Sequence, residues 1–240
     1  MNLLLLEDGE TEIGGRRGRH LVEVLRVVEG QRVRAGIVGG AVGEAEIVSV
    51  DGSHVQLRFA ATGPASAPQP VDLVLAVPRP KVLSRVLQHA AAYGVRRIDL
   101  VNAWRVDKSY LGSSKLDLDA IGENLRLGAE QGMTTHLPEV AVHRRLMQYL
   151  DAPDPPPGAR MLLADARTGD HIEQVVPAGD RAPVVIAIGP EGGWIQRELD
   201  TFAARGFAIV RLGAEVLRVE AAVTAALAQL SLLRRLTQRP

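Results

Sequence analysis

The sequence of 240 residues predicts an α/β protein in two parts. Before residue 60, short β-type segments are separated by glycine turns, whereas strand and helix patterns alternate after residue 71. Between them, residues 61–70 hold three prolines and no large apolar side chain, which is typical of a linker. Alternating strands and helices favour a mostly parallel sheet covered by helices. We therefore expect two domains, at residues 1–66 and 71–240.

The first part predicts a small β-barrel with one helix. We expect strands at 32–38, 45–50 and 55–59, with turns at Gly39-Gly40 and Asp51-Gly52. A helix over residues 18–28 is indicated by side chains that recur on one helical face. These are His20, Leu21, Val24, Leu25 and Val28.

The second part continues with alternating elements. We expect strands at 71–77, 95–101, 137–142, 161–164, 184–188 and 207–212. We expect one helix that Pro80 opens and Gly94 ends, and others over 118–131, 144–150 and 218–236. The last of these is apolar around most of its circumference, as is typical of a helix buried on several sides. We expect a homodimer in which this helix contacts the second copy; a fully internal helix is the alternative.

Composition limits the function classes. The 28 basic residues balance the 28 acidic ones, so nucleic-acid binding requires a local patch. The absence of cysteine excludes disulfides, a thiolate nucleophile and cysteine-based zinc sites. The six histidines do not fall at metal-ligand spacing, so we expect no metal. The apolar run Leu3 to Leu6 is too short for a signal peptide, and no segment reaches the length of a membrane span. We expect a cytoplasmic protein without membrane contact.

Two glycine-bearing loops follow predicted strands near the carboxyl end. Gly189-Pro190-Glu191-Gly192-Gly193 comes directly after residues 184–188, and Gly213 follows residues 207–212. Glycine lets a ligand approach backbone groups closely. Loops at one edge of an open α/β sheet are the usual place for a ligand. Because Walker-type loops and hydrolase motifs are absent, the pattern favours a neutral or zwitterionic cofactor.

The segments around these loops resemble the paired signatures of the SPOUT methyltransferase superfamily. The first is Ile186-Ala187-Ile188-Gly189-Pro190-Glu191-Gly192-Gly193-Trp194, with Glu198 following. The second is Leu212-Gly213, then Leu217-Arg218 and Glu220-Ala221-Ala222. As a pair they resemble the RsmE branch, the 16S ribosomal RNA uridine-N3 methyltransferases. Further similarity lies at His20-Leu21, Val24-Leu25-Arg26, Leu87-Gln88, Tyr93-Gly94-Val95, Ala129-Glu130-Gln131 and Pro138-Glu139.

The resemblance implies a PUA-like N-terminal barrel and a C-terminal SPOUT-type parallel sheet with a deep trefoil knot, working as a homodimer. It implies S-adenosylmethionine as the cofactor and 16S ribosomal RNA or the small ribosomal subunit as the partner. Carried over by position, the cofactor-binding residues are Leu163, Ala164, Ile188, Gly189, Glu191, Gly192, Gly193, Leu212, Gly213, Leu217 and Arg218.

Uridine-N3 methylation also implies roles for polar side chains. The N3 proton must leave, and the anion that develops on the uracil oxygens must be favoured. Arg218 is the candidate catalytic residue, because a guanidinium presents forked donors to oxygen; the alternative is that it pairs with Glu191 or Glu220 and shapes the loop. The substrate-binding candidates are His20, Arg26, Glu130 and Gln131.

Residues 2–6, 104–109 and 132–134 depart from the family pattern on its substrate side. Two other functions therefore stay open. One is a catalytically silent RNA-binding or ribosome-assembly protein with the same fold, and the other is a methyltransferase for another RNA.

Overall fold

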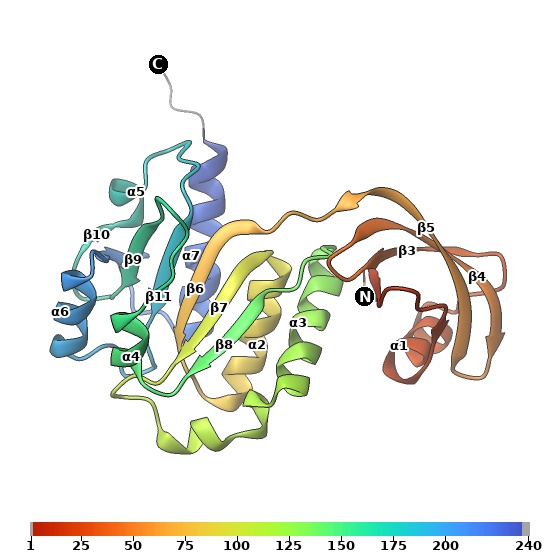
Figure 1. Cartoon of the computed structure of the whole chain (residues 1–240), viewed down its shortest axis with the longest axis horizontal. Helices are drawn as coiled ribbons and strands as arrows, with labels where there is room; N and C mark the ends of the chain where they lie inside the picture. The colour runs from red at the N-terminus through yellow and green to blue at the C-terminus, as the bar shows by residue number, and fades with distance from the viewer. Residues whose placement is uncertain (1, 237–240) are drawn as a thin grey trace.

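The computed structural model describes residues 2–236 and arranges them around two sheets (Figure 1). The first sheet has the strand order β1-β3-β4-β5-β2. Its strands are β1 (Leu4–Leu6), β2 (Glu12–Ile13), β3 (Arg32–Ile37), β4 (Ala41–Asp51) and β5 (His54–Ala65). β1 pairs parallel with β3, and the other pairs are antiparallel. Alternate apolar residues of these strands, such as Ala45, Ile47 and Val55, are fully buried in a separate small core.

The helix expected over residues 18–28 is shorter and begins earlier. α1 (Gly15–Arg19) continues into the π-helical turn η1 (His20–Val24). The prediction that Val24, Leu25 and Val28 share one face of a continuous helix is wrong, because the helical turn η1 ends at Val24. All three side chains are exposed. Arg26 has a φ of 51°, which ends the helical path and brings Val27 into the core instead.

The linker predicted over residues 61–70 is largely β-strand. β5 extends to Ala65, and β6 (Gln69–Ala76) begins four residues later. Pro64 falls between the pairs Val42–Gly63 and Ala41–Ala65, at a bulge where its missing N–H breaks no ladder bond. The short connection is also fixed: Ser66 N–H donates to Thr135 Oγ1 at 2.9 Å, and Thr135 N–H donates to Ser66 Oγ at 3.0 Å.

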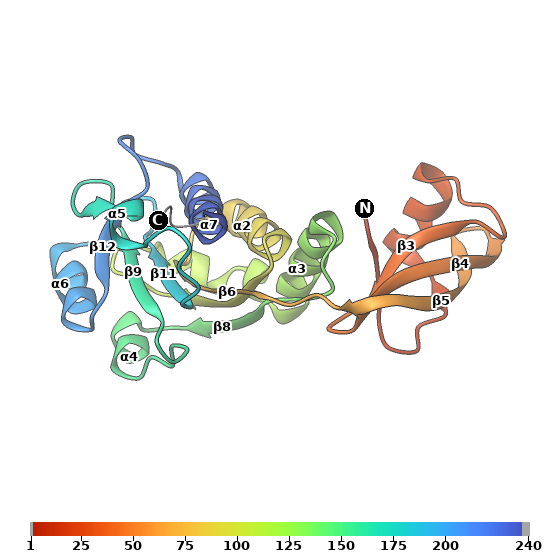
Figure 2. The ribbon, with the colours of Figure 1, turned by 90° about the horizontal axis from the view of Figure 1, so that it is seen from above.

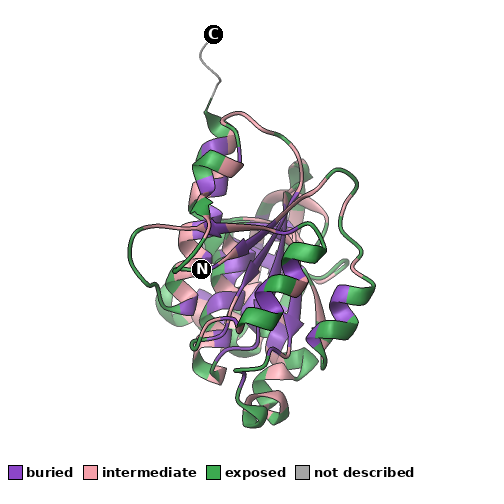
Figure 3. Ribbon diagram, turned by 90° about the vertical axis from the view of Figure 1, so that its left-hand side faces the viewer, coloured by how far each residue is buried: buried purple, intermediate pink, exposed green. Residues whose placement is uncertain are grey.

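The second sheet is entirely parallel, with the order β10-β12-β9-β11-β6-β7-β8. Besides β6, its strands are β7 (Val95–Val101), β8 (Glu139–His143), β9 (Arg160–Ala164), β10 (Asp170–His171), β11 (Val184–Ile188) and β12 (Ala208–Arg211). The strands expected from the sequence are confirmed with small shifts of their ends, and β10 is additional. Every residue of β11 is buried, because this strand lies between β9 and β6 under helices (Figure 3).

Helices cover both faces of this sheet. α2 (Pro80–Ala92), α3 (Leu118–Gly132) and α7 (Val219–Arg235) lie on one face, and α4 (Leu146–Asp151) lies on the other (Figure 2). The remaining helical segments are η2 (Lys108–Gly112), η3 (Ser114–Leu116), α5 (Ile172–Val175) and α6 (Gln196–Ala204). α3 packs closely on α2 at Gly128, where an added Cβ would lie 2.1 Å from the Gln88 carbonyl oxygen. Within residues 2–236, no helix is both long and apolar enough to cross a lipid bilayer.

One face of α7 lies in the core of the second part, through residues that include Val223, Ala226 and Leu230. On its other side, Ala221, Ala228 and Leu232 are exposed in the single chain. The homodimer stays a prediction, and this apolar face is the surface available for it.

The two parts meet along α3. The backbone N–H groups of Asn2 and Leu3 donate to the Glu130 carbonyl oxygen at 3.2 and 3.1 Å. Arg16 donates through Nε to Glu123 at 2.8 Å and through Nη2 to Glu130 at 3.3 Å. Beneath these bonds, Leu3, Leu5 and Ala129 form a small apolar cluster. The orientation of the first part is therefore set by its contacts with α3.

Glu130 at this junction predicts a pH dependence of stability. Its carboxylate is 2% exposed, one oxygen has no partner among the described residues, and burial raises its pKa above the ordinary 4.5, against the opposing effect of Arg16. A raised native pKa contributes stability that is complete below the unfolded pKa and is lost as pH rises through the native one. Glu130→Gln removes this loss. We expect the free energy of unfolding of the variant to increase relative to that of the wild type, so that the variant becomes relatively more stable, as pH rises above the ordinary glutamate pKa of 4.5.

Urea denaturation at a series of pH values measures this effect. Glu123→Gln is the matched control, because Glu123 shares Arg16 but its side chain is 49% exposed. A difference between Glu130→Gln and wild type that stays constant with pH would contradict the assignment.

Candidate functional site

Three loops that follow β9, β11 and β12 meet at the carboxyl edge of the parallel sheet. They enclose a cavity of about 720 Å³ together with the start of α2. Because β9 pairs with both β11 and β12, the ends of these strands lie side by side. The Asp165 N–H donates to the Val210 carbonyl oxygen at 3.0 Å and holds the first loop against β12.

Most residues predicted to bind a cofactor line this cavity. They are Ala164, Ile188, Gly189, Glu191, Gly192, Gly193, Leu212, Gly213, Leu217 and Arg218. Leu163 differs: it is fully buried within β9, between Ala187 and Ile209 of the neighbouring strands, and it does not line the cavity. The structure therefore brings the two glycine-bearing loops together, as expected from their positions after adjacent strands.

The glycines leave backbone groups accessible to a bound molecule. A Cβ added to Gly213 would meet no atom within 4 Å, so a side chain there would project into open space. At Gly189 an added Cβ would lie 3.0 Å from Nε1 of Trp194, which leaves no room for a larger residue. Gly193 has a φ of +71°, a conformation that favours glycine. Trp194 closes the wall and packs edge-on against Phe202 with ring centroids 5.0 Å apart.

A buried carboxylate fixes the loop after β11. Glu198 is 2% exposed; its Oε1 accepts from the Trp104 N–H at 2.8 Å, and its Oε2 accepts from the Ile195 N–H at 3.0 Å. The second bond caps the first turn of α6, in agreement with the helix-end role that its position predicts. The first bond joins the loop to the segment after β7.

Two arginines hold the same loop. Arg105 Nη1 donates to the Gly192 carbonyl oxygen at 2.5 Å, and Arg167 Nη2 donates to the Trp194 carbonyl oxygen at 3.1 Å. Neither arginine was predicted as a site residue from the sequence, nor was Asp165, which accepts from the Arg167 backbone N–H at 2.9 Å. No local sequence signal marks these residues, because their roles depend on contacts across the cavity.

Arg218 stands at the rim of the cavity with an exposed side chain, immediately before α7. It forms no ion pair within residues 2–236. The partners considered for it are engaged elsewhere: Glu220 lies 3.9 Å from Arg85, and Glu191 accepts from the Arg79 backbone N–H at 3.1 Å. The Arg218 guanidinium therefore has no carboxylate partner among residues 2–236, and the residue lines the cavity.

Comparisons with known proteins identify the family to which this chain belongs. The family model described as "RNA methyltransferase domain" matches residues 65–231. The ribosomal RNA small subunit methyltransferase E of Treponema pallidum is 30% identical over 240 residues, which cover 95% of this chain and 90% of that protein. The chain belongs to this RNA methyltransferase family. Family membership agrees with the resemblance found in the two loop signatures.

Solved structures show the same fold. The crystal structure of a ribosomal RNA small subunit methyltransferase E from Neisseria gonorrhoeae bound to S-adenosyl methionine has a TM-score of 0.80, with 21% identity over 96% of this chain and 97% of that one. A putative methyltransferase from Legionella pneumophila, in complex with the same cofactor, has a TM-score of 0.76, with 22% identity over 96% of each chain. Both cover the N-terminal sheet as well as the parallel sheet.

The predicted substrate-binding residues of this family member do not line the cavity. His20 lies in η1, where its Nε2 has no partner among the described residues and burial lowers its pKa. Arg26 is exposed on the turn after η1. Glu130 and Gln131 lie at the junction on α3, where their carbonyl oxygens accept from Asn2. Contact with RNA stays a prediction for all four.

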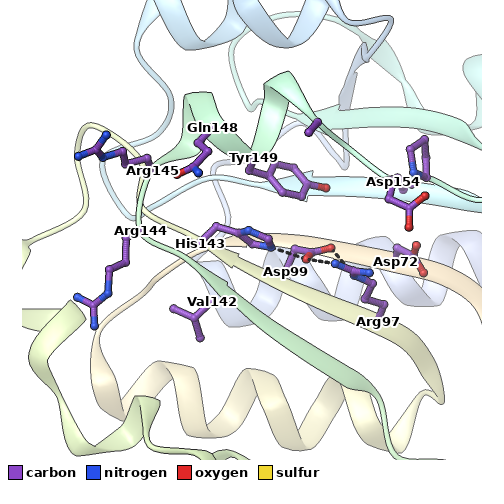
Figure 4. A pocket seen from close by; sticks show the side chains of 13 residues that line it. Asp72, Arg97, Asp99, Val142, His143, Arg144, Arg145, Gln148, Tyr149 and Asp154 are labelled. Carbon is purple, nitrogen blue, oxygen red and sulfur yellow. Dashed lines mark hydrogen bonds and ion pairs between the residues drawn. The ribbon is translucent and has the colours of Figure 1, made fainter.

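A second cavity, of about 500 Å³, lies beside α4, on the face of the parallel sheet that α2, α3 and α7 do not cover (Figure 4). Asp99 accepts from Arg97 at 2.9 Å through each oxygen and from His143 Nε2 at 2.7 Å. The His143 ring contacts Tyr149, whose pKa burial raises. Arg97, Asp99 and His143 thus form one hydrogen-bonded structural network. Within residues 2–236, no group of three or more His, Asp or Glu side chains is placed to hold a metal ion.

Proposed function

We propose that this protein uses S-adenosylmethionine to methylate N3 of a uridine in 16S ribosomal RNA. The observation that carries the proposal is the cavity between the three loops, which joins both family signatures around accessible glycine backbone. The ribosomal RNA target is supported by similarity to the ribosomal RNA small subunit methyltransferase E of Treponema pallidum, and the cofactor is supported by the S-adenosyl methionine bound in the Neisseria gonorrhoeae structure.

The cavity residues fit this cofactor. Its apolar members, such as Ile188, Leu212 and Leu217, form walls suited to an adenine ring, while backbone groups at the glycines can pair with its polar edge. Trp194 lines the same cavity, and its buried Nε1 has no hydrogen-bond partner among the described residues. When bound, S-adenosylmethionine supplies an electrophilic methyl group on a sulfonium sulfur.

The protein's own contribution is positioning and electrostatic. Loss of the N3 proton places negative charge on the uracil oxygens, and Arg218, which lines the cavity without an ion pair among residues 2–236, stabilises that charge. The bonds of Glu198 and Arg105 keep the loop after β11 fixed while the base is aligned with the methyl group. Leu163 supports this loop from the core, Arg218 lies at the open side of the bound ligand, and the other predicted cofactor residues contact the ligand directly.

The proposal also includes a specific fold for each of the two parts of the chain. We assign residues 1–66 to a PUA-like barrel and residues 71–240 to a SPOUT domain with a deep trefoil knot; residues 1 and 237–240 lie outside the described range. Support comes from strand order: β12 follows β11 in the chain, yet it lies between β9 and β10. The Leu233 carbonyl oxygen near the end of α7 also accepts from the Gly179 N–H, in the connection that precedes β11.

Assembly and location complete the proposal. A homodimer is supported by the exposed apolar side of α7 and by Val216, which is 82% exposed in the loop before it. In the dimer, the exposed Arg26 and Gln131 and the half-buried His20 contact the RNA, and the buried Glu130 supports this surface through its ion pair with Arg16. The enzyme acts on the small ribosomal subunit in the cytoplasm.

Mass spectrometry of ribosomal RNA tests the function. Cells that lack the gene are expected to lose N3-methyluridine from 16S ribosomal RNA and to regain it with the wild-type gene. An unchanged level would refute the ribosomal assignment. Calorimetry with S-adenosylmethionine distinguishes the proposed enzyme from a catalytically silent RNA-binding protein of the same fold. The silent protein is expected to give weak or no binding heat.

A further inference from the structure

A tryptophan side chain lies in solvent close to the proposed cofactor cavity. Trp104 follows β7 and is 79% exposed, whereas Trp194, the only other tryptophan of the sequence, is 1% exposed. Trp104 stacks on no other ring of residues 2–236. An indole offers a large apolar face, and leaving it in water forgoes the free energy that its burial would supply.

The backbone that displays this indole is fixed on both sides. Ala103 is 4% exposed and Val106 is 7% exposed, so the segment is anchored in the core before and after Trp104. The Trp104 N–H is held by the buried Glu198 carboxylate. These contacts make the exposure of the indole a feature of a rigid segment, which reduces the entropy cost of binding on it.

The same contacts place Trp104 beside the cavity. Arg105 donates to the carbonyl oxygen of Gly192, and Gly192 lines the cavity. Glu198 connects Trp104 to Ile195, which follows the cavity residue Trp194. One loop therefore links the indole to the proposed methyl-donor site, and the segment that carries it runs along the lower edge of the sheet in Figure 1.

The surroundings of Trp104 distinguish between classes of partner. The exposed residues that follow Trp104 in the chain include Arg105, Asp107 and Lys108. Lysine and aspartate are depleted at the centre of protein–protein interfaces, which disfavours a protein partner there. An aromatic ring beside cations is the arrangement that binds single-stranded nucleic acid, because bases stack on the ring and phosphates contact the charges.

We propose that Trp104 is a stacking platform for a base of the substrate RNA, beside the nucleotide that is methylated. Lys108 contacts the adjoining phosphate. This inference rests on the proposed RNA substrate and adds a specificity-determining residue that lies outside the cavity. It predicts that the indole contributes to RNA binding and not to cofactor binding.

Steady-state kinetics with unmethylated small ribosomal subunits tests the proposal. Trp104→Ala is expected to raise KM for the subunits about tenfold or more, as for loss of one base–aromatic stack, with a smaller change in kcat. Trp104→Phe is expected to restore most of the affinity, and the calorimetric Kd for S-adenosylmethionine is expected to stay unchanged. Leu118→Ala is the matched control, because Leu118 is 80% exposed and apolar at the start of α3.

Fluorescence gives a second readout that does not depend on turnover. Titration with oligouridylate is expected to quench wild-type emission and to leave the Trp104→Phe variant, which retains only buried Trp194, unquenched. If the wild type methylates the subunits but Trp104→Ala has an unchanged KM, the inference is wrong. It is also wrong if Trp104→Ala converts a dimer to a monomer in sedimentation, because the indole then contacts a second copy. Failure of the wild type to methylate refutes the proposed function, and the titration still tests the stack.

Discussion

Arg218→Ala is expected to lower kcat about a hundredfold or more and to leave the affinity for S-adenosylmethionine nearly unchanged, as for removal of one oriented donor to a developing anion. The physical reason is that this guanidinium is exposed at the cavity rim and forms no ion pair within residues 2–236. Its donors are therefore free to stabilise charge on the uracil oxygens in the transition state. Single-turnover kinetics at saturating cofactor, together with calorimetry, measure the two quantities separately.

Two further variants sharpen this test. Arg218→Lys keeps the charge and loses the forked geometry, so we expect activity between that of Arg218→Ala and wild type. Arg235→Ala removes an exposed arginine at the opposite end of α7 and is expected to retain full activity. Full activity of Arg218→Ala would eliminate the proposed catalytic role, and a large loss of cofactor affinity would reassign Arg218 to cofactor binding.

Glu198→Ala is expected to lower the free energy of unfolding by about 3 kcal/mol, because the N–H groups of Trp104 and Ile195 lose a buried acceptor. The same change releases the loop after β11, so cofactor affinity is expected to fall as well. Chemical denaturation and calorimetry provide the two measurements. Gln196→Ala, an exposed position two residues earlier on α6, is the control and is expected to change neither quantity appreciably. Wild-type stability in Glu198→Ala would show that the carboxylate does not hold the loop.

The sequence predicted the parallel sheet and the glycine loops because their signals are local. Residues 184–188 form an uninterrupted apolar run, and the glycines follow it directly. The linker was predicted wrongly because composition does not reveal that β4 extends far enough to pair with Ala65, nor that Pro64 falls at a bulge. The face of the first helix was wrong because periodicity assumes a continuous helix, and Arg26 interrupts it.

The hydrogen bonds that hold the loops of the site could not be predicted from the sequence, for a different reason. The bond between Trp104 and Glu198 joins residues 94 positions apart, and the bond between Arg105 and Gly192 joins residues 87 positions apart. No spacing rule relates residues at such distances. The polar network of Asp99 and His143 was missed similarly, because the two residues become neighbours only when β7 and β8 pair. Local patterns thus predicted which loops form the site, and only the fold shows what holds them.

The most direct test of this account is a crystal structure of the protein with S-adenosylhomocysteine, the demethylated product of the cofactor. The account predicts the ligand between the loops after β9, β11 and β12, in contact with the glycine backbone at Gly189–Gly193 and Gly213, and with Arg218 at its open side. A ligand bound elsewhere, for example beside Asp99 on the opposite face of the sheet, would contradict it.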